Sequence, residues 1–165
     1  MGIDPGVANT GFGVVRVAGG RMSAVDAGVV EAASGRPLEA RLATIHAELE
    51  KLISWHEPEA VALEELYFGK NARSAIAVGQ ARGVAMLAAA QNEIPCFDYT
   101  PQTVKASVCG HGGAGKGQVQ QMVASLLGLP RKPESDHAAD ALAIAICHAA
   151  HAGRAKAVAA AGVAS

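Results

Sequence analysis

The chain has 165 residues, half of them hydrophobic, which suits a single domain with a sizeable core. Its formal net charge of −1 and pI of about 6.6 argue, as averages, against a nucleic-acid partner. The sequence has no run of 18 apolar residues and no signal-peptide pattern, and its three scattered cysteines fit a reducing compartment, so we expect a cytoplasmic protein that does not enter a membrane.

Strands dominate the first part of the chain. Residues 1–3 fit the end of a first strand, and residues 10–17 and 22–31 have the composition of two more. From 38 to 53, after a proline, apolar residues recur at helical spacing. Residues 61–63 form a short apolar run that fits a buried strand.

Helices dominate the middle of the chain. Residues 71–92 predict a helix whose two glycines permit close packing, and residues 94–99 predict another strand. Thr100 is a helix N-cap followed by proline at the first helical position. The glycine-rich loop 110–117 then leads into a helix that has apolar residues on one face from Val119 to Leu127.

A last helix follows two further prolines. Either Ser135 or Asp136 caps it, and the apolar pattern carries it to about Arg154. We therefore expect one domain over residues 1–154 and a flexible alanine-rich tail over residues 155–165.

The predicted order of elements is β-β-β-α-β-α-β-α-α-α. The second and third strands would be hairpin partners of the first, whereas the fourth and fifth would arrive by helical crossovers and run parallel to it. We therefore expect an α/β domain of three layers, in which helices cover both faces of a mixed five-stranded sheet.

Four residues point to chemistry at one edge of this sheet. Asp4 ends the first strand and Glu64 ends the fourth, so both carboxylates project from the carboxyl edge, where open α/β sheets bind ligands. His137 and Asp140 share one face of the last helix, which is apolar nearly all round and must be buried against the sheet. Clustered carboxylates need a compensating charge, and oxygen-rich sites suit Mg²⁺ or Mn²⁺. Two such ions can stabilise both the attacking water and the leaving oxygen in phosphodiester hydrolysis.

Each of these residues also has an ordinary structural interpretation. Asp4 before Pro-Gly fits a turn aspartate, Glu64 fits a surface acid, and His137 fits a histidine in a capping turn. Asp140 is the hardest to explain in this way, because an acid on a buried alanine-rich helix needs a partner.

Four sequence motifs follow one another in one order. They are Gly-Ile-Asp-Pro-Gly at 2–6 with Thr-Gly-Phe-Gly at 10–13, Ala-Leu-Glu-Glu at 62–65, Gly-Gln-Ala-Arg-Gly at 79–83, and Asp-His-Ala-Ala-Asp-Ala-Leu-Ala at 136–143. From residue 2 to about 150 the chain resembles the RuvC family of Holliday-junction resolvases. The resemblance implies a ribonuclease-H-like fold and symmetric nicking of two strands at a four-way junction, in recombination and DNA repair, with ends that ligase can seal.

The resemblance also implies partners. It suggests a homodimer, for which the helix at 71–92, rich in small residues, is the expected interface. A branch-migration helicase complex would be a further partner.

By the same resemblance, Asp4, Glu64, His137 and Asp140 are the catalytic and metal-binding residues around two Mg²⁺ ions. Glu64 is preferred over Glu65 because it is the first acid after the apolar strand. Many members of the family carry aspartate where this chain has His137. A neutral imidazole favours softer ions, so Mn²⁺ is expected to substitute for Mg²⁺ or to be preferred.

Basic residues concentrate in the middle of the chain. Residues 1–65 carry a net charge of −5 and residues 66–133 a net charge of +5, an asymmetry that fits a polyanionic partner. By resemblance, Lys105 and Lys116 lie near the scissile phosphate, where Lys116 would offset charge in the transition state. The other expected DNA contacts come from two aromatic residues, which would stack on unpaired bases or else pack in the core, and from basic residues that would hold phosphates: Tyr67, Phe68, Lys70, Arg73, Arg131 and Lys132.

Other functions fit parts of the pattern. A non-catalytic junction-binding protein would have the basic surface without needing the four site residues together. A ribonuclease of the related family that trims ribosomal RNA precursors shares the fold but lacks the glutamate-then-aromatic segment and the lysine placement found here. Gly110 to Lys116 has the GxxxxGK spacing of a nucleoside-triphosphatase loop, but Gly117 replaces the Ser or Thr that such a loop requires.

Overall fold

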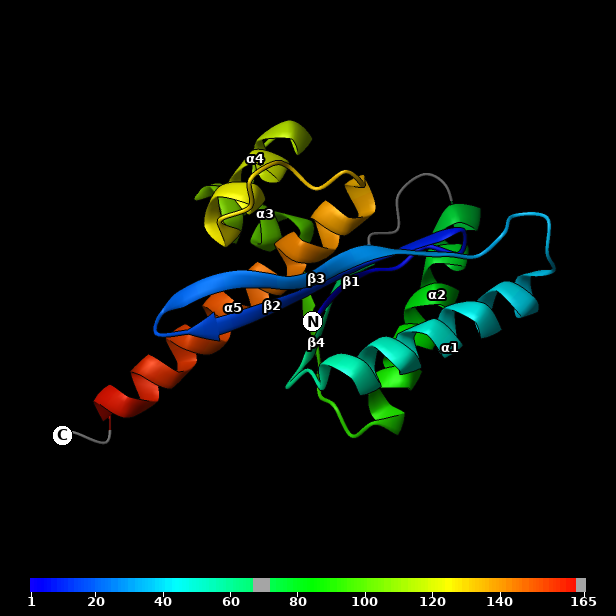
Figure 1. The fold of residues 1–165 in the computed structure, drawn as a ribbon, viewed down its shortest axis with the longest axis horizontal. Coiled ribbons are helices and arrows are strands. Elements are labelled where there is room, and N and C mark those ends of the chain that lie inside the picture. The colour runs from blue at the N-terminus through cyan, green and yellow to red at the C-terminus, as the bar shows by residue number, and fades with distance from the viewer. Residues whose placement is uncertain (67–71, 163–165) are drawn as a thin grey trace.

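The structure is a computed structural model that describes residues 1–66 and 72–162, with side chains outside the description at 72–74 and 154–162 (Figure 1). Its strands are β1 (Gly2–Asp4), β2 (Asn9–Ala18), β3 (Arg21–Glu31), β4 (Val61–Glu64) and β5 (Cys96–Tyr99). Its helices are α1 (Leu38–His56), α2 (Ala72–Gln91), α3 (Pro101–Cys109), α4 (Lys116–Leu127) and α5 (Asp136–Gly162). This is the predicted order of elements.

Within the described ranges, five strands form one mixed sheet in the order β3-β2-β1-β4-β5. β1 pairs antiparallel with β2, and β2 with β3, whereas β4 is parallel to β1 and β5 is parallel to β4. The register pairs Ile3 of β1 with Leu63 of β4. The next residues, Asp4 and Glu64, therefore lie side by side at the carboxyl edge of the sheet, as predicted.

Helices cover both faces of the sheet (Figure 1). α1 and α2 pack over one face, where Ile3, Leu63 and Ile45 belong to one core. α5 crosses the other face together with α3 and α4, over a second core that includes Ala62 and Leu142. Side chains alternate along a strand, so the residues next to Ile3 and Leu63 face α5. The predicted three-layer arrangement is confirmed, and it directs the carboxylates at the strand ends toward α5.

Glycines in β1 and β2 allow α5 to approach the sheet closely. A Cβ at Gly2 would lie 2.1 Å from the carbonyl oxygen of Ala141, and a Cβ at Gly11 would lie 2.1 Å from that of His137. The contacts are with helix backbone, which cannot move aside as a flexible side chain can. The short distance between the first turns of α5 and the sheet therefore requires glycine at positions 2 and 11.

Two of the boundaries that differ from the prediction have a direct physical cause. α5 continues to Gly162 instead of ending near Arg154, because alanine has the strongest helix propensity of all residues. β5 begins at Cys96 instead of Ile94, because Pro95 has no N–H to donate to a ladder. The Pro95 carbonyl instead accepts a hydrogen bond from the backbone N–H of Val61 at 3.0 Å.

Neither glycine of α2 is closely packed against another described part of this chain. A Cβ at Gly79 would make only ordinary contact, 3.4 Å from Leu66, and a Cβ at Gly83 would meet nothing within 4 Å. No helix among the described residues has the length and apolar character needed to span a bilayer.

Candidate active site

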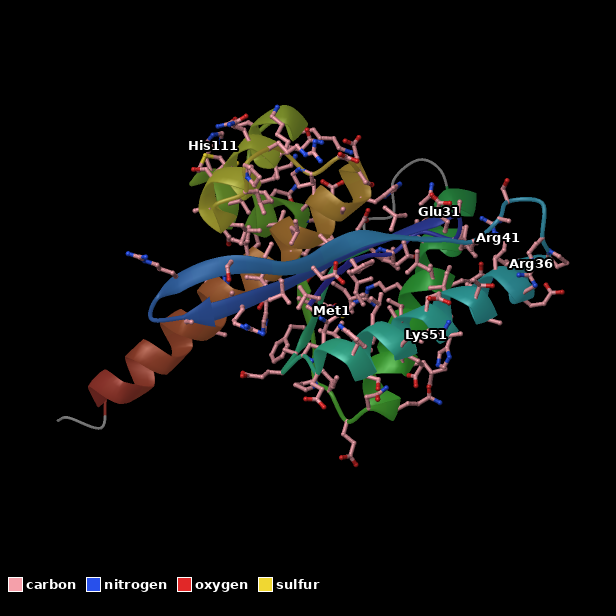
Figure 2. The ribbon with its side chains drawn as sticks, in the orientation of Figure 1. Met1, Glu31, Arg36, Arg41, Lys51 and His111 are labelled. Carbon is pink, nitrogen blue, oxygen red and sulfur yellow. The ribbon has the colours of Figure 1, made fainter. Side chains whose placement is uncertain are left out.

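Asp4, the last residue of β1, is fixed at the sheet edge by the turn that follows it. The fully buried Thr10 donates from its hydroxyl to the carbonyl of Gly6 at 2.7 Å. Arg41 of α1, labelled in Figure 2, donates from Nε to the carbonyl of Val7 at 3.0 Å and ties the same turn to the helix layer. These contacts hold the turn without using the Asp4 carboxylate, which remains available for partners across the sheet edge.

Glu64 is held beside Asp4 by the pairing of β4 with β1. Burial raises the pKa of Glu64 above its ordinary value, and the negative charges of Asp4 and Asp140 raise it further. Lys105 of α3 acts in the opposite direction and lowers this pKa. The position of Glu64 therefore disfavours its own negative charge, and an added cation would relieve that penalty.

α5 carries His137 and Asp140 to the same edge of the sheet. The segment of this helix from Ala138 to Cys147 is almost entirely buried against the sheet, which fixes the position of its first turns. Nδ1 of His137 lies 2.7 Å from Oδ2 of Asp4, and a hydrogen bond joins the two side chains. Burial raises the pKa of Asp140, the charge of Lys116 lowers it, and the charge of Asp4 raises it. The structure thus brings together all four residues singled out from the sequence.

Two of the predicted lysines lie at this cluster. Lys116, the first residue of α4, places Nζ 3.4 Å from Oδ2 of Asp140 and 3.1 Å from Oδ2 of Asp136. Lys105 reaches the cluster from α3, close enough to act on the charge of Glu64. The cluster therefore combines acids from β1, β4 and α5 with cations from α3 and α4.

The remaining predicted DNA contacts are not part of this cluster in the described residues. Arg131 and Lys132 are exposed in the loop before α5, which lines a groove of about 580 Å³ against β3. Arg131 forms an ion pair of 3.1 Å with Glu134. Three further predicted contacts, Tyr67, Phe68 and Lys70, lie outside the described residues. Arg73 lies on α2, but its side chain is outside the description.

The donor set of the cluster fits a divalent cation, although its side chains are engaged with one another. Three carboxylates supply oxygen ligands, and burial together with the neighbouring carboxylates raises the pKa values of Glu64 and Asp140, a penalty that a cation would relieve. Among the described residues, no three His, Cys, Asp or Glu side chains form a group that could hold one ion. The contacts of His137 with Asp4 and of Lys116 with Asp140 would have to open for the carboxylates to converge.

Two further polar residues lie beside the cluster. The sequence favoured Asp136 as a helix cap and indicated no role for Gln120 of α4. In the structure Gln120 donates from Nε2 to Oδ1 of Asp136 at 2.6 Å, while Lys116 pairs with the other oxygen. The spacing of Lys116 and Gln120, four residues apart on one helix face, was the available signal.

Comparisons with known proteins agree with this geometry. A family model described as "Crossover junction endodeoxyribonuclease RuvC" matches residues 1–148. A protein of that name from Pelotomaculum thermopropionicum is 52% identical over 151 residues, which are 92% of this chain and 92% of that protein. A second, from Ruminiclostridium cellulolyticum, is 51% identical over 90% of this chain and 89% of its own length.

Solved structures give the same relationship. The structure of Thermus thermophilus RuvC matches with a TM-score of 0.87 and 39% identity, and covers 93% of this chain and 95% of that one. The same protein in complex with a Holliday junction substrate matches with a TM-score of 0.87 and 40% identity, over 92% of both chains. The yeast mitochondrial Holliday junction resolvase Ydc2, at 14% identity and a TM-score of 0.59, shares the fold.

Proposed function

This chain belongs to the RuvC family of crossover junction endodeoxyribonucleases, and on that premise we propose that it resolves four-way DNA junctions by symmetric nicking of two strands, leaving ends that ligase can seal. One observation carries the proposal. The match covers residues 1–148, and within it Asp4, Glu64 and Asp140 gather at one sheet edge beside Lys116. The ribonuclease-H-like fold predicted from the motifs is the fold of this family.

Nucleases of this family are metal-dependent. We propose that Asp4, Glu64, His137 and Asp140 would hold two Mg²⁺ ions, for which Mn²⁺ can substitute. When bound, such ions activate a water molecule as nucleophile and stabilise the leaving oxygen. Three carboxylates with an imidazole are a suitable donor set, because burial and neighbouring negative charges raise the pKa values of Glu64 and Asp140 and a bound cation would offset both effects.

The lysines beside the carboxylates would serve the phosphate. The Lys116 ammonium is charged at neutral pH, and its hydrogen bond with Asp136 is the main cause that raises its pKa further above the ordinary lysine value. A charged ammonium at this position can offset negative charge that develops on the phosphate in the transition state. Lys105, whose charge acts on Glu64, is proposed as a second cation at the scissile phosphate.

Further DNA contacts are proposed from the basic and aromatic residues of the middle of the chain. Contacts of basic side chains with phosphates position the substrate without reading its sequence, and they weaken as salt increases. Aromatic stacking on bases that are unpaired at the crossover would add to binding. The residues proposed for these contacts are Tyr67, Phe68, Lys70, Arg73, Arg131 and Lys132.

We propose a homodimer through α2. Apolar residues of this helix are exposed, among them Ile76, Met86 and Leu87. Ile76, Gly83 and Leu87 recur at the spacing of a helix-pairing stripe, and a Cβ at Gly83 would meet open space. Two sites related by a twofold axis would match the approximate symmetry of a four-way junction and could cut opposite strands.

Replacing Leu87 by aspartate is expected to convert the dimer into a monomer, because the substitution puts a charge into the apolar stripe that dimerisation would bury. Sedimentation velocity at micromolar concentration measures this change. Trp55→Asp is the control, since Trp55 is an exposed apolar residue on α1, outside the proposed interface, and its replacement should leave the dimer intact. A wild-type chain that sediments as a monomer would contradict the proposed interface.

We also propose a place and a further partner for the activity. The cytoplasm, which holds bacterial DNA, is the compartment in which a junction nuclease would act. A branch-migration helicase complex would deliver junctions to the dimer, as the resemblance implies. Co-sedimentation of the dimer with such a complex on a synthetic junction tests the second point, and independent migration of the two would contradict it.

Cleavage of a synthetic four-way junction, compared with linear duplex of the same sequence, tests the proposed function. We expect paired nicks in the junction alone, with Mg²⁺ or Mn²⁺ and not with chelator. Cutting of RNA or of linear DNA would instead keep the fold and the metal site but assign the function to another nuclease. Tight junction binding without cleavage in either metal would make the protein a junction-binding module.

A further inference from the structure

A chain of polar contacts links the start of α4 to the start of α5. Gln120 donates from Nε2 to Oδ1 of Asp136 at 2.6 Å, and Lys116 pairs with Oδ2 of the same carboxylate at 3.1 Å. The Lys116 ammonium also lies 3.4 Å from Oδ2 of Asp140. One lysine is therefore shared between an acid of the proposed metal site and an acid outside it.

Stability of the fold is a poor explanation for this arrangement. The side chains of Lys116 and Asp136 are 54% and 61% exposed, and ion pairs in water contribute little to folding. Asp136 already has a favourable position as the first residue of α5, where the helix dipole favours an acid whatever its partners. The contact between Lys116 and Asp136 therefore acts mainly on the position of the Lys116 side chain and not on the stability of the fold.

A lysine at this place needs such a restraint. Its ammonium sits on a flexible stem of four carbons, and immobilising the stem costs rotamer entropy. Asp140 provides one anchor in the structure, but a divalent ion bound at Asp140 would compete for the same oxygen. Without a second anchor, the ammonium would then be free to move into solvent.

We propose that Asp136 is a positioning residue that keeps the Lys116 ammonium at the cleavage site when Asp140 binds metal. This inference rests on the proposed function. Asp136 itself touches neither the substrate nor the metal. Its carboxylate is oriented by Gln120, one helical turn beyond Lys116 on the same face of α4, so that one oxygen is engaged and the other faces the lysine.

Single-turnover cleavage of a four-way junction by Asp136→Asn tests the role. We expect the maximal rate to fall about five- to tenfold, the scale of one charge-assisted hydrogen bond, with the half-saturating junction concentration unchanged. The same substitution in a Lys116→Met background should have no further effect, because Asp136 acts only through Lys116. Asp136→Glu, which retains the charge, should recover much of the rate.

Glu48→Gln is the matched control for the loss of charge. Glu48 forms an exposed ion pair with Lys51 at 2.7 Å on α1, far from the cluster, and its replacement should leave the rate unchanged. A wild-type rate in Asp136→Asn would overturn the proposal. A full-sized fall that persists in the Lys116→Met background would overturn it as well, because the effect would then not pass through Lys116.

A second measurement does not depend on cleavage. NMR relaxation of the Lys116 Cε methylene is measured without metal or DNA in an Asp140→Asn background, which removes the anionic anchor at Asp140. We expect an ordered Lys116 side chain when Asp136 is present and a mobile one when Asp136→Asn is added. Equal mobility in both proteins would overturn the restraint. An ordered lysine, together with a wild-type protein that cuts no junction, would retain the restraint and contradict the proposed function, so the two failures are distinguishable.

Discussion

Replacing Asp140 by asparagine is expected to lower the rate of junction cleavage by at least about a hundredfold, while junction binding remains. The amide keeps the shape of the side chain but removes the negative charge that a divalent cation requires. The acid lies between Asp4 and Lys116, so its loss affects the centre of the cluster. Single-turnover cleavage and a gel-shift titration in the same buffer measure the two effects separately.

The fold should tolerate this substitution. Burial raises the pKa of Asp140, so its charged form is disfavoured in the folded protein, and a neutral amide should not lower the thermal midpoint of the metal-free chain. Asp26→Asn is the matched control, since the side chains of Asp26 and Asp140 are similarly exposed, at 43% and 39%. Asp26 lies on β3 and pairs with His56 of α1. If Asp140→Asn cleaved the junction at more than half the wild-type rate, Asp140 would not be a catalytic residue.

Replacing Gly11 by alanine is expected to destabilise the fold by about 3 kcal/mol and to impair cleavage at the same time. The new Cβ would lie 2.1 Å from the carbonyl oxygen of His137 and 2.5 Å from its carbonyl carbon. β2 would have to separate from α5 at the point where Gly11 pairs with Asp4. Urea unfolding measures the stability, and single-turnover cleavage measures the displacement of the site.

Gly35→Ala provides the comparison. Nothing lies within 4 Å of a Cβ at Gly35, and its φ is not in the left-handed region, so the substitution should be neutral or slightly stabilising. If Gly11→Ala unfolded at the same urea concentration as Gly35→Ala, this would contradict the close packing of α5 against Gly11 of β2.

The order and type of the elements followed from local pattern. Period-two and period-3.6 spacing of apolar residues, together with proline and glycine positions, predicted ten elements in the observed order. The same pattern placed Asp4 and Glu64 at strand ends that a parallel pairing must bring together. The apolar surround of Asp140 required burial of its helix, which the structure confirms.

Function depended on motif resemblance more than on physical pattern. A net charge of −1 argues against DNA binding, and each site residue by itself also fits a turn, a surface or a cap. Only the co-occurrence of the motifs from residue 2 to about 150 selected one family, and the match over residues 1–148 confirms that choice. The roles of single residues remain predictions for the experiments above.

Contacts between distant parts of the chain were decided by the tertiary structure alone. His137 and Asp4 are 133 positions apart, and no periodicity encodes which nitrogen meets which oxygen. Gly11 looked like any strand glycine until the tertiary structure showed the backbone of α5 against it, whereas a Cβ at Gly83 of α2 would meet nothing within 4 Å. The sharing of Lys116 between Asp136 and Asp140 likewise arises from packing of α4 on α5. Local sequence determines which face of an element is apolar, but the distance and register between packed elements depend on all of their side chains together.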